Sequence, residues 1–126
     1  MANNQSIVKR KLEITRQSQE KFDAYTREVS MQIFNAQIMG DTANETTLEA
    51  ILKQAKKDME DLRQALKKAL LRDDLVDDLE SGLKSKADAA DKLLKDMEQL
   101  GATLNRIAEG AHILTGALKL VRSLII

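Results

Sequence analysis

The sequence predicts an all-α protein, a bundle of three long antiparallel helices in up-down-up order with coiled-coil-like heptad packing. Two observations lead to this fold class. The 126 residues include no proline, cysteine or tryptophan and only three aromatic residues, while 32% of them are charged, which is typical of long helices. Apolar residues also recur at alternating steps of four and three, which places them on one helix face. We expect a single domain over residues 1–126.

The clearest apolar seam lies in the last third of the chain. One heptad position holds Met97, Leu104, Ala111, Leu118 and Ile125, and the other holds Leu93, Leu100, Ile107, Leu114 and Val121. The flanking positions are mostly small or apolar, whereas a two-stranded coiled coil normally carries charges there. A helix that packs on two or more neighbours needs such small residues. The pattern predicts a central helix over residues 84–126, with close helix contacts at Gly101 and Gly110.

The first helix is expected over residues 6–39, where Gly40 can supply a left-handed C-terminal cap. Its apolar face is interrupted by polar residues between Thr15 and Gln19. The first turns are therefore expected to project beyond the core or to dock on another chain. We expect the three aromatic residues to fill the core; they are Phe22, Tyr25 and Phe34.

The second helix is expected over residues 46–80, because Thr46 and Glu49 have the spacing of a capping box. An apolar series follows it at helical spacing: Leu48, Leu52, Ala55, Met59, Leu62, Leu66 and Ala69. This register slips near Asp73. Glycine favours a turn between Glu80 and Lys84, around Gly82. A tight reversal between Arg72 and Asp74, with Asp74 as the helix cap, is the alternative.

The charges balance, with 20 basic and 20 acidic residues, so no overall field attracts nucleic acid or an anionic membrane. They are nevertheless segregated. Residues 53–72 include seven basic and three acidic side chains, and residues 73–80 include five acidic and no basic ones. We interpret both blocks as solvated helix faces, and pairing between antiparallel helices or between subunits is the alternative. The acidic block lacks the glycines of a calcium loop, so a helix start explains it better.

The one histidine, His112, follows Glu109 at the Glu-x-x-His spacing that di-iron bundle proteins use. Such a site needs two of these motifs and two further carboxylates, and both residues lie on the side of the predicted helix that faces away from the seam. Glu109 and His112 are therefore weak metal candidates, and we predict no metal site and no cofactor. With no cysteine and one outward-facing histidine, the chain offers no convergent catalytic set.

These observations predict a non-enzymatic interaction or assembly protein that self-associates, or packs on a helical protein partner, through its C-terminal helix. The predicted contact residues are Leu104, Ile107, Ala111, Leu114, Leu118, Val121 and Ile125. One alternative is a membrane-active, toxin-like or interfacial protein that inserts its apolar segment at residues 107–126. Another is a chaperone or immunity-type binder that masks a partner's hydrophobic helix.

The N-terminal residues lack the apolar run of a secretory signal, and no segment reads as a transmembrane helix. The cytoplasm is therefore the default location, and secretion by a signal-independent route is the alternative.

Overall fold

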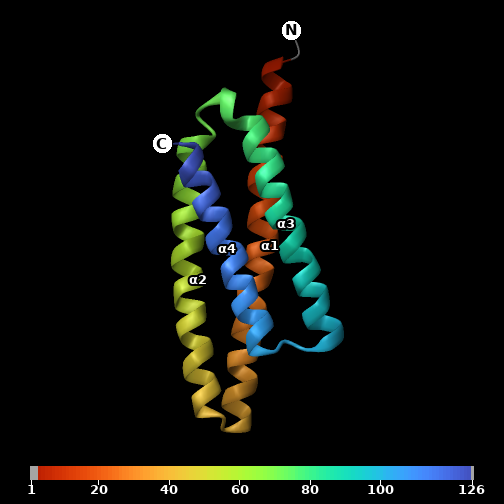
Figure 1. Cartoon of the computed structure of the whole chain (residues 1–126), viewed down its shortest axis with the longest axis vertical. Helices are drawn as coiled ribbons and strands as arrows, with labels where there is room; N and C mark the ends of the chain where they lie inside the picture. Colours follow the sequence, from red (N-terminus) through yellow and green to blue (C-terminus); the bar gives the residue numbers. More distant parts are fainter. Residues whose placement is uncertain (1–2, 126) are drawn as a thin grey trace.

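The computed structural model describes residues 3–125, with side chains from Ser6 onward, and this part of the chain is all-helical. It contains four α-helices, so the all-α prediction is confirmed and the prediction of three helices is wrong. They are α1 (Asn3–Met39), α2 (Thr42–Ala69), α3 (Val76–Leu100) and α4 (Leu104–Leu124) (Figure 1). A single 3-10 turn, η1 (Asp73–Leu75), leads into α3. Ile126, the predicted end of the third helix, lies outside the described residues.

The turn between α1 and α2 is tighter than the sequence indicated. Gly40 takes a φ of 70°, as expected for a left-handed cap. The Asp41 carboxylate then accepts a hydrogen bond from the Asn44 amide at 3.1 Å and caps α2 directly. The predicted capping box at Thr46 is wrong, because the helix has already begun at Thr42. The Thr46 hydroxyl instead donates to the Thr42 carbonyl oxygen at 2.9 Å.

The second break follows α2 at Leu70 to Arg72, which is next to the alternative position and far from the favoured one. The predicted cap at Asp74 is wrong, because Asp74 lies inside η1 and the N-cap of α3 is Leu75. Arg72 is extended, with a φ of −106° and a ψ of 112°. The predicted turn at Gly82 is wrong, since Gly82 lies inside α3. A Cβ atom on Gly82 would lie 2.7 Å from the Leu120 Cδ1 atom. This glycine therefore serves close packing of α3 on α4 and not a chain reversal.

A third break divides the helix expected over residues 84–126. Gly101 ends α3 with a φ of 103°, a conformation that favours glycine. The predicted close helix contact at Gly101 is wrong, because no neighbouring atom lies within 4 Å of the position of a Cβ atom there. The Thr103 hydroxyl oxygen then accepts from the Arg106 amide at 3.3 Å and caps α4. The apolar steps continue in register across this reversal, which is why they suggested one helix. Leu100 and Leu104, on either side of the break, are 66% and 41% exposed.

The helices form a four-sided bundle in which α1 packs on α2 and α3, and α4 packs on the same two helices. The connection from α2 to α3 therefore crosses one end of the bundle diagonally (Figure 1). Tyr25 spans the other diagonal, since it is buried and donates a hydrogen bond to the Ile107 carbonyl oxygen of α4. A Cβ atom on Gly110 would overlap the Tyr25 ring, so the predicted close approach at Gly110 is confirmed.

The α1–α2 hairpin is longer than the α3–α4 hairpin. At the end opposite the diagonal connection, α1 and α2 extend beyond the loop that joins α3 to α4 (Figure 1). We call residues 31–48, which lie on either side of the α1–α2 turn, the overhang.

Candidate interaction surfaces

The predicted contact residues of the C-terminal helix lie mostly inside the single chain. Ile107, Leu114, Leu118 and Val121 are at most 3% exposed. Ala111 and Ile125 are half-buried, and Leu104 is exposed. Packing within the chain is thus sufficient to explain the apolar seam, and the contact of these seven residues with a second chain stays a prediction.

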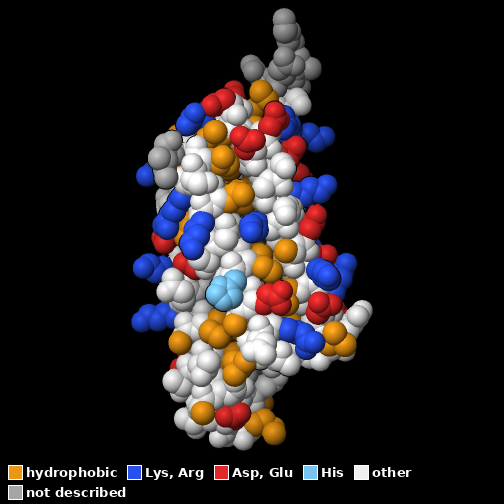
Figure 2. All heavy atoms as spheres, viewed as in Figure 1, with side chains coloured by type: hydrophobic (Ala, Val, Ile, Leu, Met, Phe, Trp, Pro, Cys, Tyr) orange, Lys and Arg blue, Asp and Glu red, His pale blue; other side chains and the backbone are white. Residues whose placement is uncertain are grey.

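The weak metal candidates stand apart from any cluster of ligands. Glu109 and His112 are both exposed, and the histidine is visible on the outer surface of α4 (Figure 2). In the part of the chain that the structure describes, no group of three or more histidine, cysteine, aspartate or glutamate side chains could hold a metal ion.

The acidic block at the start of α3 makes ion pairs with the beginning of α1. Arg10 binds Asp77 and Glu80, and Lys11 binds Asp73 at 2.6 Å. The neighbouring Arg72 guanidinium lowers the pKa of Asp74. The carboxylates also lie at the start of η1 and α3, where the helix dipole favours negative charge. These contacts account for the block as a structural element.

One face of the overhang carries exposed hydrophobic side chains. Met31, Phe34 and Ile38 follow one another at steps of three and four on α1 and are 58%, 58% and 67% exposed. The expectation that Phe34 fills the core is wrong. Ile33 and Ala36 occupy the buried face of α1 here, and Phe34 points away from them. We call Met31, Phe34 and Ile38 the distal stripe.

The distal stripe continues into a cleft between α1 and α3. This cleft has a volume of about 520 Å³ and is lined by Ala24, Met31, Leu94 and Met97 and by the charged residues Arg27, Glu28 and Glu98. Met31 belongs to both features. Together they form an apolar surface that no other element in the described chain covers.

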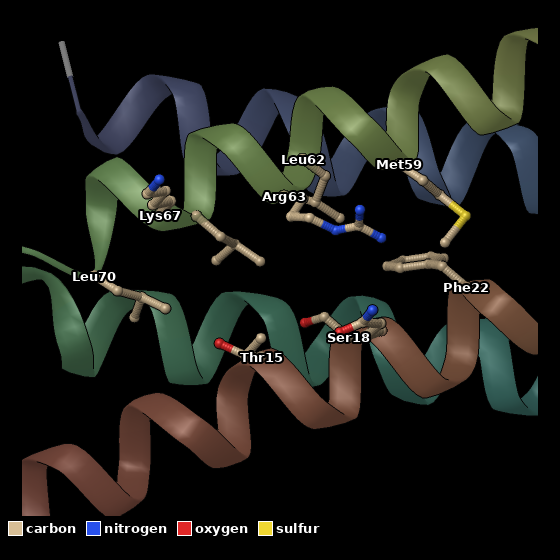
Figure 3. Close-up of a pocket in the computed structure, with 10 residues that line it drawn as sticks. Thr15, Ser18, Phe22, Met59, Leu62, Arg63, Lys67 and Leu70 are labelled. Carbon is tan, nitrogen blue, oxygen red and sulfur yellow. The ribbon is translucent and has the colours of Figure 1, made fainter.

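A second depression, the α1–α2 groove, lies between the first two helices nearer the opposite end. Its volume is about 260 Å³. Phe22, Met59, Leu62, Leu66 and Leu70 supply most of its walls, and Arg63 and Lys67 line it from α2. Figure 3 shows Ser18 on the α1 side, facing Leu62 and Arg63 across the gap. The Ser18 hydroxyl is buried and has no hydrogen-bond partner.

Comparisons with family models, curated proteins and solved structures give no match. The fold and surfaces define a small four-helix bundle with uncovered apolar surfaces. The described helices include none that is long and apolar enough to cross a membrane. Sequence reasoning missed both surfaces on α1, although one signal was visible. From Val29 to Gly40 the chain carries no charge, which is unusual for a helix with one side exposed to water.

Proposed function

We propose that this chain is a non-enzymatic helical interaction protein that self-associates through the distal stripe and the adjoining α1–α3 cleft. The observation that carries the proposal is the exposure of Met31, Phe34 and Ile38 on an uncharged length of α1. Methionine and aromatic residues are enriched, and charged residues depleted, at the centres of protein interfaces. Single exposed hydrophobic residues are common on protein surfaces, but three on one stripe beside an apolar cleft mark an interaction site.

A second copy of the chain is the partner that these features favour. In a two-fold symmetric contact each surface meets itself, so like charges at its centre would repel. The stripe has no such charges, and the charged residues that line the adjoining cleft carry both signs; they are Arg27, Glu28 and Glu98. The whole chain has a net charge of zero, which reduces the long-range repulsion between copies. The seam of α4 is largely used within the chain, so the exposed side of α1 offers the larger unoccupied apolar area.

Replacement of Phe34 by glutamate should disrupt this contact. The buried carboxylate would face its own copy across the symmetry axis without a cation to pair with. We expect the wild-type chain to give a discrete multiple of 14.1 kDa by size-exclusion chromatography with light scattering. We expect F34E to dissociate at concentrations at least about tenfold higher than wild type.

The matched control is Leu71→Glu, which changes another exposed hydrophobic residue to glutamate beyond the opposite end of α2, where Leu71 is 80% exposed. It should leave the mass unchanged. A wild-type monomer at all concentrations would overturn self-association. An equal loss of mass in both variants would remove the distal stripe from the proposal.

A further inference from the structure

The α1–α2 groove has the dimensions of a site for a slender ligand. Cavities of roughly 150 Å³ lined by leucine and phenylalanine bind molecules as large as benzene, and this groove has about 260 Å³. A partner helix about 10 Å across would need far more room. The lining residues of α2 run from Met59 to Leu70, about 16 Å along the helix at 1.5 Å per residue. An extended chain of about ten carbons is shorter than this, given bonds of about 1.5 Å.

The lining charges of the groove are all positive. Arg63 and Lys67 line it, and no carboxylate does. The Arg63 Nη1 atom lies 3.1 Å from the Glu60 Oε2 atom, but both side chains are more than half exposed, so this ion pair is weak and uses only part of the guanidinium. Lys67 makes no ion pair with the side chains that the structure describes. Figure 2 shows basic side chains gathered on the side of α2.

Ser18 adds a polar group at the depth of the groove. Ser18 is only 2% exposed, and its hydroxyl oxygen has no partner in the described structure. A buried hydroxyl without a hydrogen bond is costly. Because Ser18 faces Arg63 across the gap (Figure 3), one ligand anion could accept hydrogen bonds from both side chains.

We infer that the α1–α2 groove binds a free medium-chain carboxylic acid. The carboxylate lies between the Ser18 hydroxyl and the Arg63 guanidinium, with Lys67 one helical turn further along α2. The alkyl chain lies against Leu66 and its apolar neighbours. Apolar walls provide most of the affinity, and the hydroxyl and the two cations select an anionic head group. This site lies on the α2 side of α1 and is separate from the distal stripe.

Decanoate is the probe, and the methionine methyl groups report where it binds. Met59 lines the α1–α2 groove, whereas Met31 and Met97 line the α1–α3 cleft. In protein labelled with carbon-13 at the methionine methyl groups, titration with decanoate should shift the Met59 signal saturably at one equivalent. The Met31 and Met97 signals should stay in place. Dilution of the wild-type protein, by contrast, should move the Met31 and Met97 signals if the proposed self-association is correct.

Two variants and one control test the role of each group. Arg63→Gln with Lys67→Gln should weaken decanoate binding about tenfold or more, as loss of charge-assisted hydrogen bonds predicts. Lys57→Gln with Lys68→Gln makes the same charge change on exposed positions of α2 outside the groove lining, and should change binding less than about twofold. Ser18→Leu should fill the groove and abolish the decanoate-induced shift of the Met59 signal. The other methionine signals should keep the chemical shifts of the folded protein.

Several results would overturn the inference. The first is the absence of a saturable shift of the Met59 signal with decanoate. The second is binding of decyltrimethylammonium or decanol as tight as that of decanoate. The third is a loss of decanoate binding in the Lys57/Lys68 control variant equal to that in the Arg63/Lys67 variant. A lower solution mass for S18L than for wild type would assign the groove to a second copy of the chain, and would also overturn it.

Discussion

The buried Ser18 hydroxyl is expected to lower the free energy of unfolding of this protein. This hydroxyl is the only buried side-chain polar atom without a hydrogen-bond partner in the described part of the chain. Removal of such a group relieves its desolvation penalty, which is about 1–3 kcal/mol. We therefore expect Ser18→Ala to increase the free energy of unfolding by about 1–2 kcal/mol, measured by urea denaturation without added ligand.

The control for this substitution is Ser30→Ala on the same helix. Ser30 is exposed, so its replacement should add only the higher helix propensity of alanine, at most about 0.5 kcal/mol. Ser18→Ala should exceed this gain. An equal gain in the free energy of unfolding for both substitutions would mean that the Ser18 hydroxyl is hydrogen-bonded in solution. The α1–α2 groove would then have no unpaired hydroxyl to offer a ligand.

The sequence could predict individual side chains where the local pattern contains the reason for their position. Glycine inside a helix lowers its stability, so we expected a neighbouring element to pack closely at Gly110. The buried Tyr25 ring lies against this glycine. The exposure of Phe34 was present in the same pattern and was overlooked. Phe34 lies nine residues after Tyr25, about 2.5 helical turns, so it falls on the side of α1 opposite the buried tyrosine. A heptad pattern shows which face of a helix is apolar and contains no information on what stands opposite.

Gly101 decides whether the last third of the chain forms one helix or two. Its φ of 103° is unfavourable for any residue with a Cβ atom. We expect Gly101→Ala to lower the free energy of unfolding by about 1 kcal/mol or more. Denaturation with urea, followed by circular dichroism, measures this difference.

Gly116→Ala is the matched control for Gly101→Ala. Gly116 lies within α4, and a Cβ atom there would meet only the flexible end of Lys86, with Nζ at 3.1 Å. This substitution should be neutral or stabilise the protein by up to about 1 kcal/mol through helix propensity. Stabilisation by alanine at both positions would mean that α3 and α4 form a continuous helix in solution.

At the level of elements, the sequence predicted helix content better than helix ends. The slip in register near Asp73 marks a true break in the helix. The turn was predicted at Gly82 instead, because glycine is common in turns. Gly82 is instead needed where Leu120 packs against α3. The break at Gly101 was hidden because the apolar steps of four and three continue through it. The local signal of this break was Gly101, which can end a helix, followed two residues later by Thr103, which can begin one.

At the scale of the whole molecule, the two hairpins are joined by polar contacts between helices far apart in sequence. Lys21 of α1 binds Asp91 of α3 at 2.8 Å. Hydrogen bonds from two lysine side chains lower the pKa of Asp91 below its ordinary value of 3.8, with the larger effect from Lys21 and the smaller from Lys95. A carboxyl with a lowered pKa stabilises the folded state above its unfolded pKa, and this stabilisation is lost as the pH falls through the folded pKa.

We therefore expect Asp91→Asn to be less stable than wild type near neutral pH and equal to it in acid well below pH 3.8. The difference should be small, because both partners of the ion pair are about one-third exposed. Asp88→Asn removes the same charge from an exposed position of α3 and should show no such convergence. Urea denaturation at several pH values separates the two variants. A difference for Asp91→Asn that persists in acid would contradict the ion-pair explanation.

The diagonal crossing between α2 and α3 has a consequence for the order of folding. Each hairpin is built from a continuous length of chain, and its two helices are joined by a short turn. The seams between hairpins join residues such as Lys21 and Asp91, which are 70 positions apart, and Asp58 and Thr115, which are 57 apart. Closing such long loops carries a larger entropic cost. We therefore expect the two hairpins to form as local units, and their docking across the α1–α3 and α2–α4 seams to be the late step that completes the native state.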